Sequence, residues 1–138
     1  MAWCVLCSIS ALPKMRVLIV ADDESVRRAL ACVVRYSGWE SDACGPQADV
    51  IALLANPGID VVLLDHRMWG VDGLEIARNI RSRNIAVPVV LMSPITDSIR
   101  RHVVKELQIA KVISKPPSLK ELRSALEEAF GAPAVVTD

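Results

Sequence analysis

The sequence predicts an α/β domain in which five strands alternate with five helices around a parallel sheet. Apolar runs typical of buried strands recur along the chain, and a segment with helical spacing of its apolar residues follows each of them. Strict alternation of strands and helices places the helices on both faces of a parallel sheet. A length of 138 residues, 52% of them apolar, is sufficient for one core. The predicted strands cover residues 16–21, 39–44, 59–65, 88–93 and 110–114.

The strand segments differ in polarity, and this difference indicates where each lies in the sheet. Val61-Val62-Leu63-Leu64 is a continuous apolar run, which suits a strand buried on both faces. Residues 39–44 are more polar, so we expect that strand near an edge.

Helical spacing predicts helices over 25–36, from Gly45-Pro46 to residue 55, and over 73–83, 96–107 and 119–130. Ser37-Gly38 is a typical helix stop. In the last helix, Ser118 and Glu121 form a capping-box pattern. Its expected inner stripe is Leu119, Leu122, Leu126 and Phe130.

The two ends of the chain lie outside this repeating pattern. Met1 to Leu12 is apolar and uncharged, but it is too short to span a bilayer and lacks the positive region of a signal peptide. We therefore predict a flexible extension over residues 1–14, one domain over 15–131 and a mobile tail over 132–138.

Composition argues against several classes of function. Lys plus Arg equals Asp plus Glu at 16 each, and aromatic residues make up 4%, so neither a basic patch nor a base-stacking platform is expected. The four cysteines show no zinc-finger spacing, and we expect free thiols in a reducing cytosol. These observations predict a cytoplasmic protein without direct nucleic-acid or membrane binding.

Polar groups follow the strands at their carboxyl ends, where open α/β sheets place their sites. Asp22-Asp23 follows the first strand, Asp65 ends the third, Ser93 ends the fourth and Lys115 follows the fifth. Clustered carboxylates suit Mg²⁺, which prefers oxygen ligands. A lysine and a hydroxyl beside them suit phosphoryl transfer onto Asp65.

With these motifs in this order, residues 15–130 resemble a receiver domain of two-component response regulators. Asp72-Gly73 and Lys115-Pro116 also match the family pattern. The resemblance implies a flavodoxin-like (βα)5 fold with strand order 2-1-3-4-5. Because the chain ends soon after the fifth helix, we expect a stand-alone receiver. The resemblance implies that it is not an enzyme but takes part in its own phosphorylation and dephosphorylation.

The resemblance implies a role for each site residue. Asp65 would be the phosphoacceptor, with Ser93 and Lys115 binding phosphoryl oxygens. Mg²⁺ or Mn²⁺ would be held by Asp22, Asp65 and the backbone carbonyl of Arg67, with Asp23 in support. The Lys115-Pro116 peptide is often cis in relatives.

The implied partners are proteins. A histidine kinase or phosphotransfer protein would supply the phosphoryl group, and a downstream effector would receive the signal. A homodimer through the fourth helix, fifth strand and fifth helix is possible in this family.

Some positions depart from the family pattern and keep an alternative open. Ala21 replaces the first acid, Trp69 a usual proline, Pro94 a small residue and Val112 an aromatic ring. The alternative is a pseudo-receiver, the same fold acting as an interaction module independent of phosphorylation. A dehalogenase-type hydrolase is disfavoured because it would need a second aspartate at the position of Arg67. A flavodoxin is disfavoured because Asp22-Asp23-Glu24 would repel the phosphate of its flavin.

The remaining candidates have ordinary explanations. Both histidines, His66 and His102, are expected at the surface. The arginines are expected on solvated helix faces: Arg78, Arg81, Arg83, Arg100 and Arg101.

Overall fold

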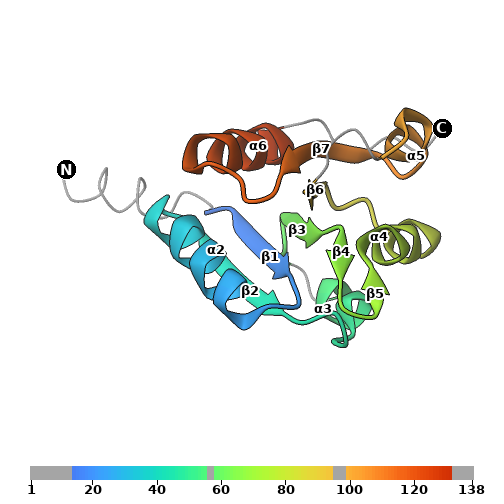
Figure 1. The fold of residues 1–138 in the computed structure, drawn as a ribbon, viewed down its shortest axis with the longest axis horizontal. Coiled ribbons are helices and arrows are strands. Elements are labelled where there is room, and N and C mark those ends of the chain that lie inside the picture. Colours follow the sequence, from blue (N-terminus) through green and yellow to red (C-terminus); the bar gives the residue numbers. More distant parts are fainter. Residues whose placement is uncertain (1–13, 56–57, 95–98, 132–138) are drawn as a thin grey trace, which may run out of the picture.

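The computed structural model describes residues 14–55, 58–94 and 99–131, and within them a central sheet is covered by helices on both faces (Figure 1). The strands of the sheet are β1 (Arg16–Val20), β2 (Glu40–Cys44), β3 (Val61–Asp65), β6 (Val89–Ser93) and β7 (Ile109–Ser114). The helices are α2 (Glu24–Tyr36), α3 (Val50–Ala55), α4 (Gly73–Ser82), α5 (Arg101–Glu106) and α6 (Leu119–Gly131). A short hairpin of β4 (Arg67–Met68) and β5 (Val71–Asp72) connects β3 to α4.

The sheet is parallel throughout and has the order β2-β1-β3-β6-β7. Counted along the chain as the sheet's first to fifth strands, this is the order 2-1-3-4-5, so the predicted fold class is confirmed. The more polar strand β2 lies at one edge, as its composition predicts, and the apolar β3 lies at the centre with every residue buried.

Two hydrophobic clusters, one on each face of the sheet, make up the core. Alternate residues of β3 point to opposite faces, so Val61 and Leu63 join one cluster while Val62 and Leu64 join the other. Helices α2 and α6 cover the first face, and α3, α4 and α5 cover the second, as Figure 1 also shows.

Helix α2 ends at the stop that Ser37-Gly38 predicts, whereas its N-cap was not predicted. Asp23 precedes it as N-cap, with its carboxylate accepting the backbone N–H of Ser25 at 2.8 Å. Gly38 follows it at φ +90°, a left-handed conformation that suits glycine. The chain can therefore turn sharply into β2.

Several predicted boundaries are wrong. Helix α3 begins at Val50 rather than at Gly45-Pro46, because Asp49 caps it by accepting the N–H of Ala52 at 3.0 Å. Helix α5 begins at Arg101, since Arg100 is extended at φ −67° and ψ 140°. Part of the predicted helix over 96–107 lies outside the described residues.

The β4–β5 hairpin was not predicted, because the sequence shows only a glycine-rich turn there.

In α6 the predicted cap is half realised. The hydroxyl of Ser118 accepts the backbone N–H of Glu121 at 3.0 Å, but the Glu121 carboxylate accepts the hydroxyl of Ser114 at 2.7 Å. The Glu121 side chain therefore joins α6 to the end of β7 instead of completing a capping box.

The predicted inner stripe of α6 is wrong at both ends. Leu119 and Phe130 are exposed, whereas Leu122 and Leu126 are buried as predicted. Ala125 and Ala129 are buried on the inner face too.

Arg81 does not lie on a solvated helix face as predicted. Its guanidinium is half-buried and donates to the backbone carbonyls of Leu107 at 2.8 Å and Ile85 at 2.7 Å. Burial lowers the pKa of Arg81 from its ordinary value. The side chain thus ties the end of α4 to the turn that follows α5. The other arginines of that set are exposed, as is His102.

The predicted extension and tail fall on residues 1–13 and 132–138, which lie outside the described residues. Across the part of the chain that the structure describes, no helix combines the length and the apolar character needed to cross a membrane.

Candidate functional site

Asp65 is the last residue of the central strand β3 and is fully buried. Its Oδ2 accepts a hydrogen bond of 2.5 Å from Nζ of Lys115, which follows β7. Its Oδ1 is also buried and has no hydrogen-bond partner. A buried polar atom without a partner is costly, so this oxygen is a natural place for a ligand to bind.

The electrostatics of Asp65 follow from these contacts. Burial raises the pKa of the Asp65 carboxyl above its ordinary value, and the nearby Asp22 charge raises it further. The hydrogen bond and positive charge of Lys115, and to a lesser extent the backbone N–H of Arg67, lower that pKa, but they only partly offset burial. A cation beside Asp65 and Asp22 would therefore relieve both desolvation and repulsion.

The two acids that follow β1 have different surroundings. Asp22 Oδ2 accepts the backbone N–H of Trp69 at 2.7 Å, which links the end of β1 to the β4–β5 hairpin. Asp23 is exposed, and its carboxylate caps α2. Asp22 is therefore directed toward the site, while Asp23 is engaged by the helix.

These groups fit a magnesium ion better than a transition metal. No set of three or more His, Cys, Asp or Glu side chains gathers at a metal-binding distance within the described ranges. Mg²⁺ needs only one or two carboxylates, because carbonyl groups and water complete its shell. Asp65 and Asp22 supply two carboxylates, and Arg67 lies two positions after Asp65, at the start of β4.

Gly73, the first residue of α4, lies directly against the strand that carries Asp65. A Cβ placed on Gly73 would lie 2.1 Å from the backbone oxygen of Asp65, and the Gly73 N–H donates to the carbonyl of His66 at 2.7 Å. Only glycine permits this close approach. The Asp72-Gly73 motif thus holds α4 against the end of β3.

Ser93 ends β6 and is buried, with 1% of its surface exposed. Its Oγ lies 3.3 Å from Nδ1 of His66. The prediction that His66 lies at the surface is wrong, since only 6% of it is exposed. The alternation of β3 was the signal: His66 continues the series of Val62 and Leu64, which face the α3–α5 side.

Three positions that depart from the family pattern differ in their exposure to solvent. Trp69 is 87% exposed on the β4–β5 hairpin, and Pro94 is exposed after Ser93. Val112 packs partly buried against the core of the α3–α5 face. The Lys115-Pro116 peptide is cis, as the resemblance implies.

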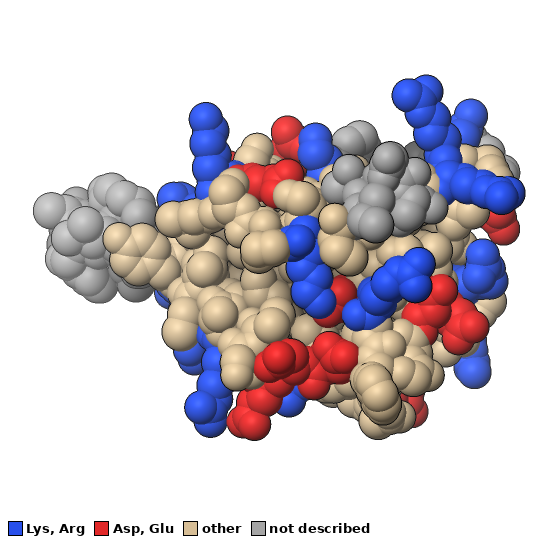
Figure 2. Space-filling view, viewed as in Figure 1, with Lys and Arg blue, Asp and Glu red and all other residues tan. Residues whose placement is uncertain are grey.

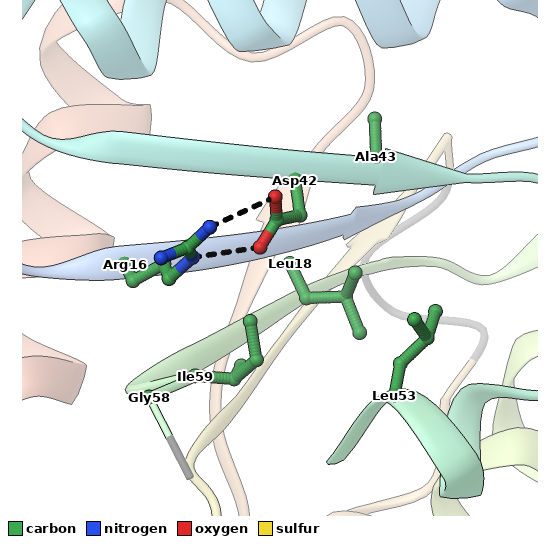
Figure 3. Close-up of a pocket in the computed structure, with 7 residues that line it drawn as sticks. All are labelled: Arg16, Leu18, Asp42, Ala43, Leu53, Gly58 and Ile59. Atoms are coloured by element: carbon green, nitrogen blue, oxygen red, sulfur yellow. Dashed lines mark hydrogen bonds and ion pairs between the residues drawn. The ribbon is translucent and has the colours of Figure 1, made fainter. Parts of the chain in front are cut away.

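One pocket among the described residues lies away from Asp65. It has a volume of about 440 Å³ between β1, β2 and α3 (Figure 3). The guanidinium of Arg16, which lines this pocket, already donates two hydrogen bonds to the carboxylate of Asp42, at 2.7 and 3.3 Å. This charge is therefore satisfied within the protein.

Charges of both signs are interspersed over the face shown in Figure 2. Such a distribution does not favour a long polyanion on that face, in keeping with the zero net charge.

The family model of the response regulator receiver domain matches residues 17–127. Among curated proteins, "Sensory transduction protein RegX3" of Mycolicibacterium smegmatis is 34% identical over 106 residues, which cover 77% of this chain and 46% of that protein. "Transcriptional regulatory protein TrcR" of Mycobacterium tuberculosis is 31% identical over 113 residues, covering 81% of this chain and 44% of the relative. The chain thus spans about half the length of the curated relatives it matches.

Solved structures share the fold. Vibrio cholerae chemotaxis protein CheY4 superposes with a TM-score of 0.76 at 19% identity, covering 84% of this chain and 98% of that one. A Francisella response regulator receiver domain gives 0.75 at 21% identity, covering 85% and 97%.

Proposed function

The chain belongs to the response regulator receiver domain family, and we propose that it accepts a phosphoryl group on Asp65. The observation that carries the proposal is the buried Asp65 carboxylate at the end of β3, with one oxygen on Lys115 and the other without a partner. Receiver domains act in two-component systems, between histidine kinases and effectors. The donor here would be a histidine kinase or a phosphotransfer protein.

In this proposal an oxygen of Asp65 attacks the phosphorus of a phosphohistidine. The new O–P bond forms as the P–N bond breaks, and the electron pair of the P–N bond stays with the donor's imidazole. A raised pKa makes the carboxylate more basic and therefore a better nucleophile. The product is an acyl phosphate on Asp65.

Lys115 changes partner during this transfer. In the resting chain its Nζ donates a hydrogen bond to Oδ2 of Asp65. When the donor arrives, Nζ would leave this oxygen and bind a phosphoryl oxygen instead. The hydroxyl of Ser93 would donate a hydrogen bond to another phosphoryl oxygen. The two residues together offset the charge that the phosphoryl group brings.

Receiver domains generally bind Mg²⁺ at this acidic pocket. In this chain Asp65, Asp22 and the Arg67 carbonyl would hold Mg²⁺ or Mn²⁺, with Asp23 limited to a supporting role by its helix cap. When bound, the ion would supply charge stabilisation on the phosphoryl oxygens. The unpartnered Oδ1 of Asp65 supports this assignment.

The protein would signal rather than turn over a substrate. It would take part in its own phosphorylation and dephosphorylation and act on an effector protein, with a homodimer through α5, β7 and α6 as one route. We place it in the cytoplasm, where the free thiols of Cys32 and Cys44 would stay reduced.

The test is incubation with Mg²⁺ and acetyl phosphate, followed by intact mass measurement. We expect one added phosphoryl group, removable by hydroxylamine as befits an acyl phosphate, in the wild type and in Asp72→Asn. Asp65→Asn should gain none. An unmodified wild type that also fails to accept phosphate from histidine kinases would favour the pseudo-receiver alternative.

A further inference from the structure

We propose that His66 is a positioning residue, which holds the Ser93 hydroxyl in the resting chain and releases it when a phosphoryl group binds. The second half of this inference rests on the proposed function, because it needs a phosphoryl group on Asp65. The first half concerns the resting chain alone.

The geometry is a chain of three side chains from three separate segments. Ser93 Oγ at the end of β6 lies 3.3 Å from Nδ1 of His66, directly after β3. Nε2 of His66 lies 3.5 Å from Oδ1 of Asp72, the N-cap of α4. Ser93 and His66 are buried, whereas Asp72 is exposed.

The partners determine where the protons lie. A neutral imidazole has one N–H and one acceptor nitrogen. In this proposal the ring is neutral and its N–H lies on Nε2, toward the Asp72 carboxylate, which only accepts when ionised. With this tautomer Nδ1 accepts, and the Ser93 hydroxyl donates its single proton to His66.

That single proton creates a competition. When a phosphoryl group arrives on Asp65, the hydroxyl of Ser93 can donate to it only by leaving Nδ1 of His66. The ring that loses this bond also contacts Oδ1 of Asp72, which accepts the N–H of Leu74 at 2.9 Å. The event at Asp65 thereby reaches the first turn of α4 without an aromatic ring at Val112.

Beryllofluoride with Mg²⁺, a phosphoryl mimic, measures this competition as a binding affinity. His66→Leu removes the resting bond and should tighten binding by about three- to tenfold, the usual range for one neutral hydrogen bond. His66→Asn keeps a polar atom near the Nδ1 position and should stay within about twofold of wild type. His66→Gln, whose amide lies nearer the Nε2 position, should resemble His66→Leu.

The Ser93→Ala background is the matched control. If His66 acts through Ser93, His66→Leu should change the affinity of Ser93→Ala by less than about twofold. The same tightening in both backgrounds would overturn the proposal. So would equal effects of the Asn, Gln and Leu variants, which would mark His66 as a packing residue.

Ring-nitrogen NMR tests the resting bond without any phosphoryl mimic. We expect the Nε2–H tautomer at His66, and an Nδ1 shift that moves in Ser93→Ala while the exposed His102 does not change. An Nδ1–H tautomer, or no response to Ser93→Ala, would overturn the resting bond. Failure of the wild type to bind beryllofluoride would contradict the proposed function and the release step. The ring-nitrogen NMR would still decide whether His66 and Ser93 are hydrogen-bonded in the resting chain.

Discussion

The carboxylate of Asp22 accepts the backbone N–H of Trp69 at 2.7 Å, although the two residues lie 47 positions apart. This bond joins the end of β1 to the β4–β5 hairpin. The Trp69 side chain on that hairpin is almost fully exposed. A metal ion at Asp22 and Asp65 would draw on the same carboxylate. The state of the metal site should therefore be visible at Trp69.

We expect Mg²⁺ to change the fluorescence of Trp69 in a variant carrying Trp3→Phe and Trp39→Phe. Asp22→Asn should weaken the titration by roughly tenfold or more, because even the outer partners of a metal contribute about 10- to 100-fold. Asp23→Asn is the matched control and should titrate close to wild type, since its carboxylate caps α2. Equal midpoints in all three proteins would place the ion elsewhere.

Stability should depend on pH through Asp65. Its folded pKa is raised, so at pH values above the unfolded pKa of about 3.9 the folded state binds more protons than the unfolded state. The free energy of unfolding should then fall as pH rises through the folded pKa. Asp65→Asn removes this decline and should be more stable than wild type at pH 7 without metal.

Urea unfolding between pH 4 and pH 8, in the presence of a chelator, checks this direction. The gap between Asp65→Asn and wild type should open with rising pH. Glu127→Gln, which changes an exposed carboxylate on α6, should follow the wild-type curve. A gap that closes as pH rises would mean that Lys115 outweighs burial.

Lys115→Ala should destabilise the protein at pH 7 by about 1–3 kcal/mol. Removing one partner of a buried ion pair typically costs about 3–5 kcal/mol, and the partial exposure of Lys115 reduces that figure. In the Asp65→Asn background the same change should cost much less, because no buried charge is left behind. Lys111→Ala breaks an exposed pair with Glu128 and serves as the control, expected within about 0.5 kcal/mol. An equal loss in both Asp65 backgrounds would contradict the pairing argument.

Gly73→Ala should destabilise the fold by about 2–3 kcal/mol, because the new methyl group would meet the backbone of Asp65. It should also lower the rate of phosphorylation by acetyl phosphate, since α4 and Asp65 must separate. Gly45→Ala is the control: its Cβ meets only the Arg27 side chain at an ordinary 3.7 Å. Chemical denaturation of both variants decides the matter, and similar midpoints would refute the close-approach argument.

Much of this protein follows from the sequence alone. Five apolar runs alternating with helical patterns determine the class of fold, because periodicity reports which faces of each element are buried. The polar residues at strand ends indicate the site, because parallel strands bring their carboxyl ends to one edge. Asp65, Asp22 and Lys115 were located by this reasoning, and the structure brings them together.

Only the tertiary structure decided which partner each of these side chains meets. His66 contacts Ser93 and Asp72 because β3, β6 and α4 converge there, although the nearest of these contacts in sequence is six positions away. Asp22 and Asp23 are adjacent and chemically alike, yet one holds the hairpin and the other caps a helix. Sequence patterns report local conformation and burial, whereas the pairing of hydrogen-bonding groups depends on how distant elements pack.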